Sequence, residues 1–253
     1  MIDTNVHLHR WPFRHVAGDD PVGLVSRLRQ RGVTQAWAGS FDGLLHRDVT
    51  GVNARLAADC RRFGTGFLMP FGSINPMLPD WQEDLARCQQ RFHMRGVRLH
   101  PNYHGYTLAD AVFREVLAAA APRQMIVQIA LSMEDERTQH PLMRVAPVNP
   151  APLAEVLAGA PDARIVLLNS NHLTYAKKLA GPANVLFDIA MVEGVGGVAR
   201  LAEAVSPERV VFGSHFPLFY FESASLKIKE AGLVAGQASA IRERNARKLL
   251  QTS

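Results

Sequence analysis

The opening stretch Ile2-Asp3-Thr4-Asn5-Val6-His7-Leu8-His9 gives a strong indication of the fold of this chain. Its apolar residues alternate with polar ones. A β-strand has the same period of two, so the stretch predicts a strand that opens the chain. In a regular strand, one face would carry Asp3, Asn5, His7 and His9. Four polar groups on one face do not suit an apolar core, but they suit the inside of a barrel near its C-terminal mouth. The alternative is an edge strand with a solvated face.

The rest of the chain alternates between strand and helix signals. Strands are predicted over residues 1–8, 33–40, 67–71, 96–100, 125–131, 164–168, 185–190 and 210–213. Helices are predicted over residues 21–31, 48–62, 80–93, 108–121, 150–157, a segment ending at 179, 195–205, 223–231 and 235–250. Strict alternation favours a parallel sheet, and eight strand–helix units favour an α/β fold of the (β/α)8 TIM-barrel type. No Gly-x-Gly-x-x-Gly follows the first strand, which argues against an open dinucleotide-binding sheet.

Length and composition fit one such domain over residues 1–253, with 47% hydrophobic residues. Cys60 and Cys88 lie in predicted helices without a metal-binding or redox spacing, which predicts a reducing compartment. No apolar run approaches the ~20 residues of a membrane span, and no basic-then-apolar leader opens the sequence. We therefore expect a cytoplasmic protein that does not bind membranes.

The formal net charge is +5. Lysines and arginines are scattered through predicted helices among acidic residues, as in the segment 242–248, without interleaved aromatic residues. This distribution is typical of solvated helix faces, so we expect no nucleic-acid partner. A positive field favours a small anionic substrate.

Short motifs at the predicted strand ends resemble those of a known family. The opening run resembles Ile-Asp-Thr-His-Val-His, and Gly96-Val97-Arg98-Leu99-His100-Pro101 resembles Gly-Val-Lys-Leu-His-Pro. Phe212-Gly213-Ser214-His215-Phe216-Pro217 resembles Phe-Gly-Ser-Asp-x-Pro, and residues 184–188 and 245–249 resemble a seventh strand and a closing helix. Together the motifs resemble the amidohydrolase-2 branch of the amidohydrolase superfamily. The resemblance implies a TIM barrel that hydrolyses a small amide, ester or lactone, or decarboxylates a small carboxylic acid.

The same resemblance implies one divalent metal. The family holds it through two first-strand histidines, histidines after strands five and six, and an aspartate after strand eight. Here those positions carry Asn5 and His7, Gln128 or Ala130, Asn169, and His215. Catalytic zinc usually needs three nitrogen, sulfur or carboxylate ligands, and amide oxygens suit harder cations better. We therefore expect no tightly bound metal at the inherited position.

Three interpretations of this mouth remain open. In the first, His7, His9 and His215 hold a divalent metal such as zinc at a shifted site. In the second, His7 and His215 act without metal as general base and acid, while Asn5, Gln128 and Asn169 donate hydrogen bonds to a carbonyl oxygen. In the third, the barrel is non-catalytic and binds a ligand or pairs with an active homologous barrel. A homo-oligomer is also compatible with the sequence.

Further residues are candidates for substrate binding, namely Arg98, His100, Gln128, Tyr103 and Arg137. Arg98 could bind a carboxylate, or it could form a buried ion pair with Asp3 or Asp188. The charged loop 132–149 is either a lid or a solvated turn. The predicted function is hydrolysis of a small, carboxylate-bearing amide, ester or lactone, or decarboxylation of a small acid.

Overall fold

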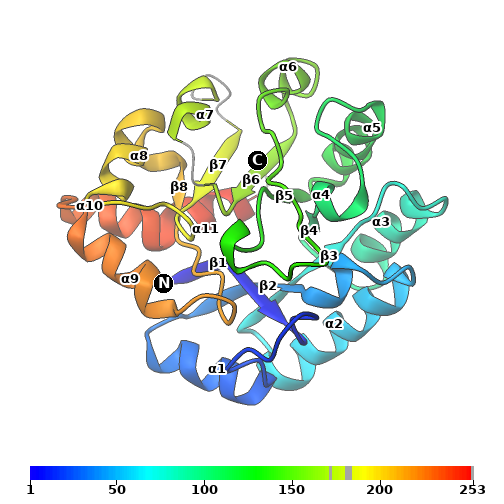
Figure 1. The fold of residues 1–253 in the computed structure, drawn as a ribbon, viewed down its shortest axis with the longest axis horizontal. Coiled ribbons are helices and arrows are strands. Elements are labelled where there is room, and N and C mark those ends of the chain that lie inside the picture. Colours follow the sequence, from blue (N-terminus) through cyan, green and yellow to red (C-terminus); the bar gives the residue numbers. More distant parts are fainter. Residues whose placement is uncertain (171–172, 180–183, 252–253) are drawn as a thin grey trace.

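Eight parallel strands form the centre of the molecule in a computed structural model that describes residues 1–170, 173–179 and 184–251. They pair in chain order, and helices surround them (Figure 1). The strands are β1 (Ile2–Leu8), β2 (Gln35–Ser40), β3 (Leu68–Ser73), β4 (Gly96–Leu99), β5 (Ile126–Ala130), β6 (Arg164–Leu168), β7 (Val185–Asp188) and β8 (Val210–Val211). The predicted (β/α)8 TIM barrel is confirmed, and each strand lies within a few residues of its predicted position.

The chain closes the barrel between β1 and the segment that follows β8. The backbone N–H of Thr4 donates to the carbonyl of Phe212 at 2.9 Å, and Val6 and Phe216 form a parallel bridge. The backbone N–H of His215 donates to the carbonyl of Asn5 at 2.8 Å. This closure brings the eighth-strand motif beside the opening stretch, although about 210 residues separate them in sequence.

The helices begin where the sequence offers caps. Asp20 accepts a hydrogen bond from the backbone N–H of Gly23 at the start of α1, and Asp48 accepts one from Gly51 at the start of α2. The helices are α1 (Pro21–Gln30), α2 (Val49–Gly64), α3 (Trp81–Gln90), α4 (Pro101–His104), α5 (Ala111–Ala120), α6 (Leu153–Ala158), α7 (Leu173–Lys178), α8 (Gly197–Val205), α9 (Phe221–Glu230), α10 (Ala235–Ser239) and α11 (Asn245–Leu250). The terminal helix predicted over 235–250 contains a π-helical segment, Ala240–Arg244, and α4 was not predicted.

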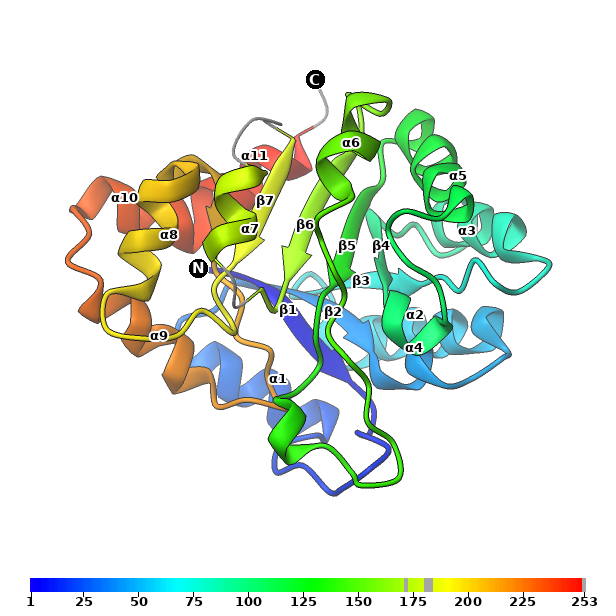
Figure 2. The same cartoon turned by 45° about the horizontal axis from the view of Figure 1, so that its top comes forward.

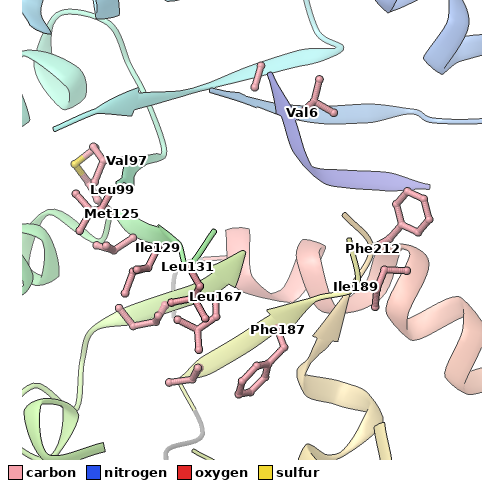
Figure 3. Packing of buried hydrophobic residues seen from close by; sticks show 14 of the residues in the cluster. Val6, Val97, Leu99, Met125, Ile129, Leu131, Leu167, Phe187, Ile189 and Phe212 are labelled. Atoms are coloured by element: carbon pink, nitrogen blue, oxygen red, sulfur yellow. The ribbon is translucent and has the colours of Figure 1, made fainter. Parts of the chain in front are cut away.

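Two apolar layers stabilise the barrel. The larger one lies between strands and helices, and Figure 3 shows part of it, including Val6 of β1, Leu99 of β4 and Phe187 of β7. The smaller one draws its side chains from seven strands and from α11, so it fills the barrel interior: Ile2, Trp37, Phe71, Ile126, Val166, Leu168, Leu186, Val211 and Ala246. None of the helices described in the structure is both long and apolar enough to cross a bilayer.

The opening strand does not alternate as strictly as expected. Ile2 packs inside the barrel, whereas Val6 and Leu8 pack in the outer layer. The pairing of β1 with β2 shifts register between Asp3 and Val6, and one extra residue exchanges the two faces of a strand. The prediction that Asp3, Asn5, His7 and His9 share one face is therefore wrong.

Candidate functional site at the barrel mouth

The mouth of the barrel, at the C-terminal ends of the strands, holds a buried group of polar side chains. They come from β1, β4, β5 and the segments after β6 and β8: Asn5, His7, Arg98, Gln128, Asn169 and His215, each at most 1% exposed. A buried polar group is costly unless it is hydrogen-bonded, so the partners of each one indicate its role.

Arg98 lies at the centre of this group. Its Nε donates to Oε1 of Gln128 at 2.9 Å, and its Nη1 donates to the carbonyl of Val6 at 3.1 Å and to Nε2 of His7 at 2.7 Å. Its Nη2 lies 3.4 Å from the carbonyl of Trp37. Burial lowers the pKa of Arg98 to about 9, so the side chain is charged at neutral pH.

No described carboxylate accepts a hydrogen bond from Arg98, so the ion pair with Asp3 or Asp188 considered from the sequence is not formed. Four of the five guanidinium N–H groups are directed to protein acceptors. Arg98 therefore cannot form a bidentate pair of hydrogen bonds with a substrate carboxylate. What Arg98 can offer a ligand is a fixed positive charge.

His7 is held as a neutral ring in one tautomer. Arg98 can only donate, so Nε2 of His7 accepts and the ring proton is on Nδ1. That Nδ1 is buried and has no hydrogen-bond partner among the described residues. The ring stacks on Phe41, with centroids 4.5 Å apart and an interplanar angle of 5°. Burial, and secondarily the charge of Arg98, keeps the pKa of His7 well below its usual value.

His215 is held in the opposite way. Its Nε2 lies 2.7 Å from the carbonyl of Met133, so Nε2 carries the proton and Nδ1 has a free lone pair. This Nδ1 is also buried without a described partner. Burial lowers the pKa of His215 to about 4. The rings of His7 and His215 meet edge to face, with centroids 4.9 Å apart. Because their hydrogen bonds select opposite tautomers, Nδ1 of His7 carries a proton and Nδ1 of His215 is basic.

Two amides occupy positions that the resemblance assigns to metal ligands. Nδ2 of Asn5 donates to Oδ1 of Asn169 at 2.8 Å and to Oδ2 of Asp188 at 2.7 Å. Nδ2 of Asn169 donates to the carbonyl of Ser132 at 2.6 Å. Burial raises the pKa of Asp188 to about 6, and the hydrogen bonds from Asn5 and Asn169 oppose that rise. Asp188 was not predicted as a site residue, although its place at the end of a strand was a signal for it.

The other amide, Gln128, is a structural link. Its Nε2 donates to the carbonyl of Thr4 at 2.7 Å, and its Oε1 accepts from Arg98. Asp3 accepts from the hydroxyl of Ser214 at 2.5 Å and from the backbone N–H groups of Asn5 and Ser214. Burial raises the pKa of Asp3 to about 7. Gln128 thus joins β5 to β1, and Asp3 joins β1 to the segment after β8.

His100 adds a second polar feature to the mouth. Its side chain is fully buried, and neither ring nitrogen has a partner among the described residues. Burial keeps its pKa well below the usual value, and the neighbouring His104, Arg98 and His215 act in the same direction. A neutral imidazole with two unpaired nitrogens offers one donor and one acceptor to a ligand. Tyr103 packs nearby against an apolar group over the mouth.

Two predicted residues are not brought to this group. β1 ends at Leu8, and His9 has a positive φ of 67°. Its ring nitrogens lie 2.6 Å from the hydroxyl of Ser40 and 3.1 Å from Asp59. Arg137 pairs with Asp135 in its own loop, and its side chain is 86% exposed. The three imidazoles of the shifted metal site are therefore not assembled.

The donor set does not fit a divalent metal at the inherited position. Nε2 of His7 accepts a hydrogen bond from a guanidinium and Nδ1 carries the proton, so in this tautomer the ring has no lone pair for a metal, and the charge of Arg98 would repel a second cation. Asn5 presents its amide nitrogen, a donor, toward Asn169 and Asp188. Within residues 1–170, 173–179 and 184–251, no three His, Cys, Asp or Glu side chains could hold a metal ion.

A cavity of about 970 Å³ lies at the opposite end of the barrel. It is bounded by the N-terminal ends of β6 and β7 and by α11, and Arg164, Glu208 and Lys248 are among the residues that line it. None of the mouth residues described above contributes to it. Enzymes of this fold keep their chemistry at the C-terminal ends of the strands, so we place the candidate site at the mouth.

Solved structures with the same fold include several enzymes. A structure described as amidohydrolase II has a TM-score of 0.74 and 16% identity, and the alignment covers 98% of this chain and 99% of that one. 2,6-Dihydroxybenzoate decarboxylase from Rhizobium has a TM-score of 0.70 and 11% identity, with 98% of each chain covered. 5-Carboxyvanillate decarboxylase from Sphingomonas paucimobilis has a TM-score of 0.69 and 12% identity, covering 90% of this chain and 82% of that one.

At these identities the similarity shows the fold alone. No curated protein matches the chain in sequence. The sequence profile of the family described as "Amidohydrolase", the amidohydrolase-2 group, matches residues 2–252. The predicted resemblance is thereby confirmed, and the chain belongs to the amidohydrolase-2 family.

Proposed function

We propose that this chain hydrolyses a small amide, ester or lactone that carries a carboxylate, with His215 as general base and His7 as hydrogen-bond donor. The observation that carries the proposal is the pair of unpaired, buried Nδ1 atoms, one protonated and one basic, on two rings in contact. A general base and an N–H donor near one carbonyl group are the two elements that hydrolysis requires.

The proposed reaction begins when Nδ1 of His215 removes a proton from a water molecule. The water oxygen then attacks the substrate carbonyl, and Nδ1–H of His7 donates to the oxygen that gains negative charge. The tetrahedral intermediate collapses, the bond to the leaving group breaks, and Nδ1–H of His215 returns the proton to that group. Water is consumed and an acid is released, and no metal takes part in a step.

The charge of Arg98 supports an anionic substrate. The guanidinium is fully buried and donates to no described carboxylate, although the charges of Asp188 and Asp3 favour its protonated form. Interior charges interact more strongly than charges in water, so a substrate carboxylate near the mouth would be stabilised without touching Arg98. The same charge stabilises the negative oxygen of the intermediate.

Decarboxylation of a small acid is the second candidate. Two of the similar structures are decarboxylases of aromatic acids, and a buried cation near the mouth suits a carboxylate in either reaction. The two reactions differ in what they need, because decarboxylation requires an acid to protonate carbon. At neutral pH a group with a pKa of about 4 is almost entirely unprotonated, so His215 begins the reaction as a base with no proton to deliver to carbon, which favours hydrolysis.

A substrate screen tests the proposal. The purified protein is incubated with small lactones, esters, amides and aromatic acids, and acid release and CO₂ release are measured separately. Acid release without CO₂ is the expected result. CO₂ release from an aromatic acid would favour the second candidate. Absence of turnover, together with co-purification of a homologous barrel, would favour the non-catalytic alternative.

The pH dependence of the reaction provides a prediction. A base works only when unprotonated, and burial lowers the pKa of His215 to about 4. We expect kcat/KM to be retained through the mildly acidic range and to fall as pH decreases through about 4, as measured in a pH profile. If kcat/KM instead fell as pH decreased through about 6.5, the ordinary histidine pKa, this result would contradict the buried, neutral state of the ring.

The inherited metal position provides another prediction. Because Arg98 uses the lone pair of His7, we expect elemental analysis of protein purified without chelator to find less than one equivalent of zinc or manganese. We also expect metal chelators to leave activity unchanged. One equivalent of metal, with density beside His7 in a crystal structure, would contradict the prediction.

A further inference from the structure

The segment 132–134, shortly after β5, contacts two of the mouth residues through its backbone. The carbonyl of Ser132 accepts from Nδ2 of Asn169 at 2.6 Å, and the carbonyl of Met133 accepts from Nε2 of His215 at 2.7 Å. The second contact fixes which nitrogen of His215 is basic. Correct placement of this segment is therefore a condition for the basic Nδ1 of His215.

The segment also covers the mouth. The side chain of Met133 belongs to an apolar group, here called the mouth cluster: Trp11, Val16, Phe41, Leu44, Ala130 and Met133, with Phe13, Tyr103 and Leu218 against it. Phe41 of this cluster stacks on His7, and Trp11 packs edge to face on Phe41 with centroids 5.2 Å apart. His7 and His215 are consequently at most 1% exposed.

One ion pair ties the segment to the opposite side of the mouth. Nη1 of Arg14, in the loop after β1, donates to both carboxylate oxygens of Glu134, at 2.8 and 3.0 Å. The side chain of Glu134 is 2% exposed, whereas that of Arg14 is 45% exposed. In Figure 2 the loop after β5 runs beside the loop after β1, where this ion pair joins them.

The burial of Glu134 makes its ion pair with Arg14 important for holding the segment in place. A buried carboxylate is stable only with a partner, and Arg14 is the cation paired with Glu134 among the described residues. Loss of Arg14 would leave Glu134 buried and uncompensated, and the carboxylate would then be expected to move into water. Movement of Glu134 would take Met133 with it, because the two residues are adjacent in the chain.

We propose that Glu134 and Arg14 are positioning residues whose ion pair, here called the latch, holds the segment 132–134 over the mouth and thereby keeps His215 covered and fixed by the carbonyl of Met133. The role of this latch in catalysis rests on the proposed hydrolytic function. Its role in covering His215 does not, so the latch can be tested without a substrate.

The experiment measures the accessibility of His215 with diethyl pyrocarbonate, which acylates exposed, unprotonated imidazoles. Tryptic peptide 210–227 contains His215 as its single histidine, so mass spectrometry reads its modification directly. His15, whose side chain is 78% exposed, lies in another peptide and serves as the internal reference. We expect His215 to be modified at least tenfold more slowly than His15 in the parent protein, and Glu134→Gln to accelerate it at least tenfold.

Matched variants separate the latch from general loosening of the loop. Asp135→Asn removes the neighbouring exposed ion pair with Arg137 and is expected to leave the His215 rate unchanged. Arg14→Gln breaks the latch from its exposed side and should reproduce Glu134→Gln, whereas Arg14→Lys keeps a positive charge and should show a smaller effect. The buried thiols of Cys60 and Cys88 report global unfolding, because they react with a thiol reagent only if the barrel opens.

Two results would overturn the proposal. The first is a parent-like His215 rate in both Glu134→Gln and Arg14→Gln. The second is an equal acceleration in Asp135→Asn. If Glu134→Gln also exposes the thiols of Cys60 and Cys88, that variant is unfolding, and the modification rate of His215 in Arg14→Gln is used to test the proposal instead. An intact latch in a protein without turnover would leave the positioning of His215 established and the hydrolytic function refuted.

Discussion

Replacement of His215 by asparagine is expected to lower kcat/KM by at least about 100-fold, the lower end of what general acid–base groups contribute. Asparagine removes the basic Nδ1, and because its side chain is shorter than the imidazole it also leaves the carbonyl of Met133 without its donor, so thermal unfolding must show that the variant is folded at the assay temperature. Asparagine tolerates the positive φ of 58° at this position. The measurement is steady-state kinetics on the substrate identified in the screen.

An exposed histidine provides the control. His46→Asn changes the same atoms on the surface, at the loop after β2, and is expected to keep the parent kcat/KM. If His215→Asn retains activity, His215 is structural and the catalytic assignment at the end of the eighth strand is wrong. The conclusion is independent of whether the reaction proves to be hydrolysis or decarboxylation.

Replacement of Arg98 by methionine is expected to weaken binding of a carboxylate ligand by about 30-fold. One charge at roughly 7 Å in a medium of effective dielectric constant about 20 contributes about 2 kcal/mol, and each 1.4 kcal/mol is tenfold in affinity. A neutral ester of the same ligand should lose much less, because it carries no charge for Arg98 to stabilise. Calorimetric titration of both ligands into both proteins measures the difference.

Arg98→Lys is the matched variant, because it keeps the charge but offers fewer hydrogen-bond donors. We expect it to retain most of the preference for the carboxylate. The methionine variant also leaves acceptors at Val6 and Gln128 unpaired, so thermal unfolding must show that it is folded at the assay temperature. Equal losses for the carboxylate and its neutral ester would refute the role of Arg98 charge in substrate choice.

Sequence patterns are sufficient to predict the barrel and the identity of most mouth residues. Eight apolar strand segments separated by capped helices permit few topologies, and parallel strands place all their C-terminal ends at one mouth. The positions of Asn5, His7, Arg98, Asn169 and His215 could therefore be predicted from motif order alone. Caps such as Asp20 and Asp48 act within a few residues, so they too were readable from the chain.

The roles of these residues depend on contacts that the sequence does not reveal. The register shift in β1 and the positive φ of His9 cannot be read from alternation, so His9 was wrongly placed beside His7 on one face. The partner of Arg98 depends on contacts across the barrel, and these proved to be His7 and Gln128 rather than Asp3 or Asp188.

The tautomers of His7 and His215 and the ion pair between Arg14 and Glu134 also depend on tertiary contacts. Which nitrogen of His7 or His215 is basic depends on a donor 91 residues away in one case and an acceptor 82 residues away in the other. Arg14 and Glu134 are 120 residues apart, and nothing local marks them as a pair. Sequence patterns encode local periodicity, whereas these properties arise from contacts that exist only after the ring of strands has closed.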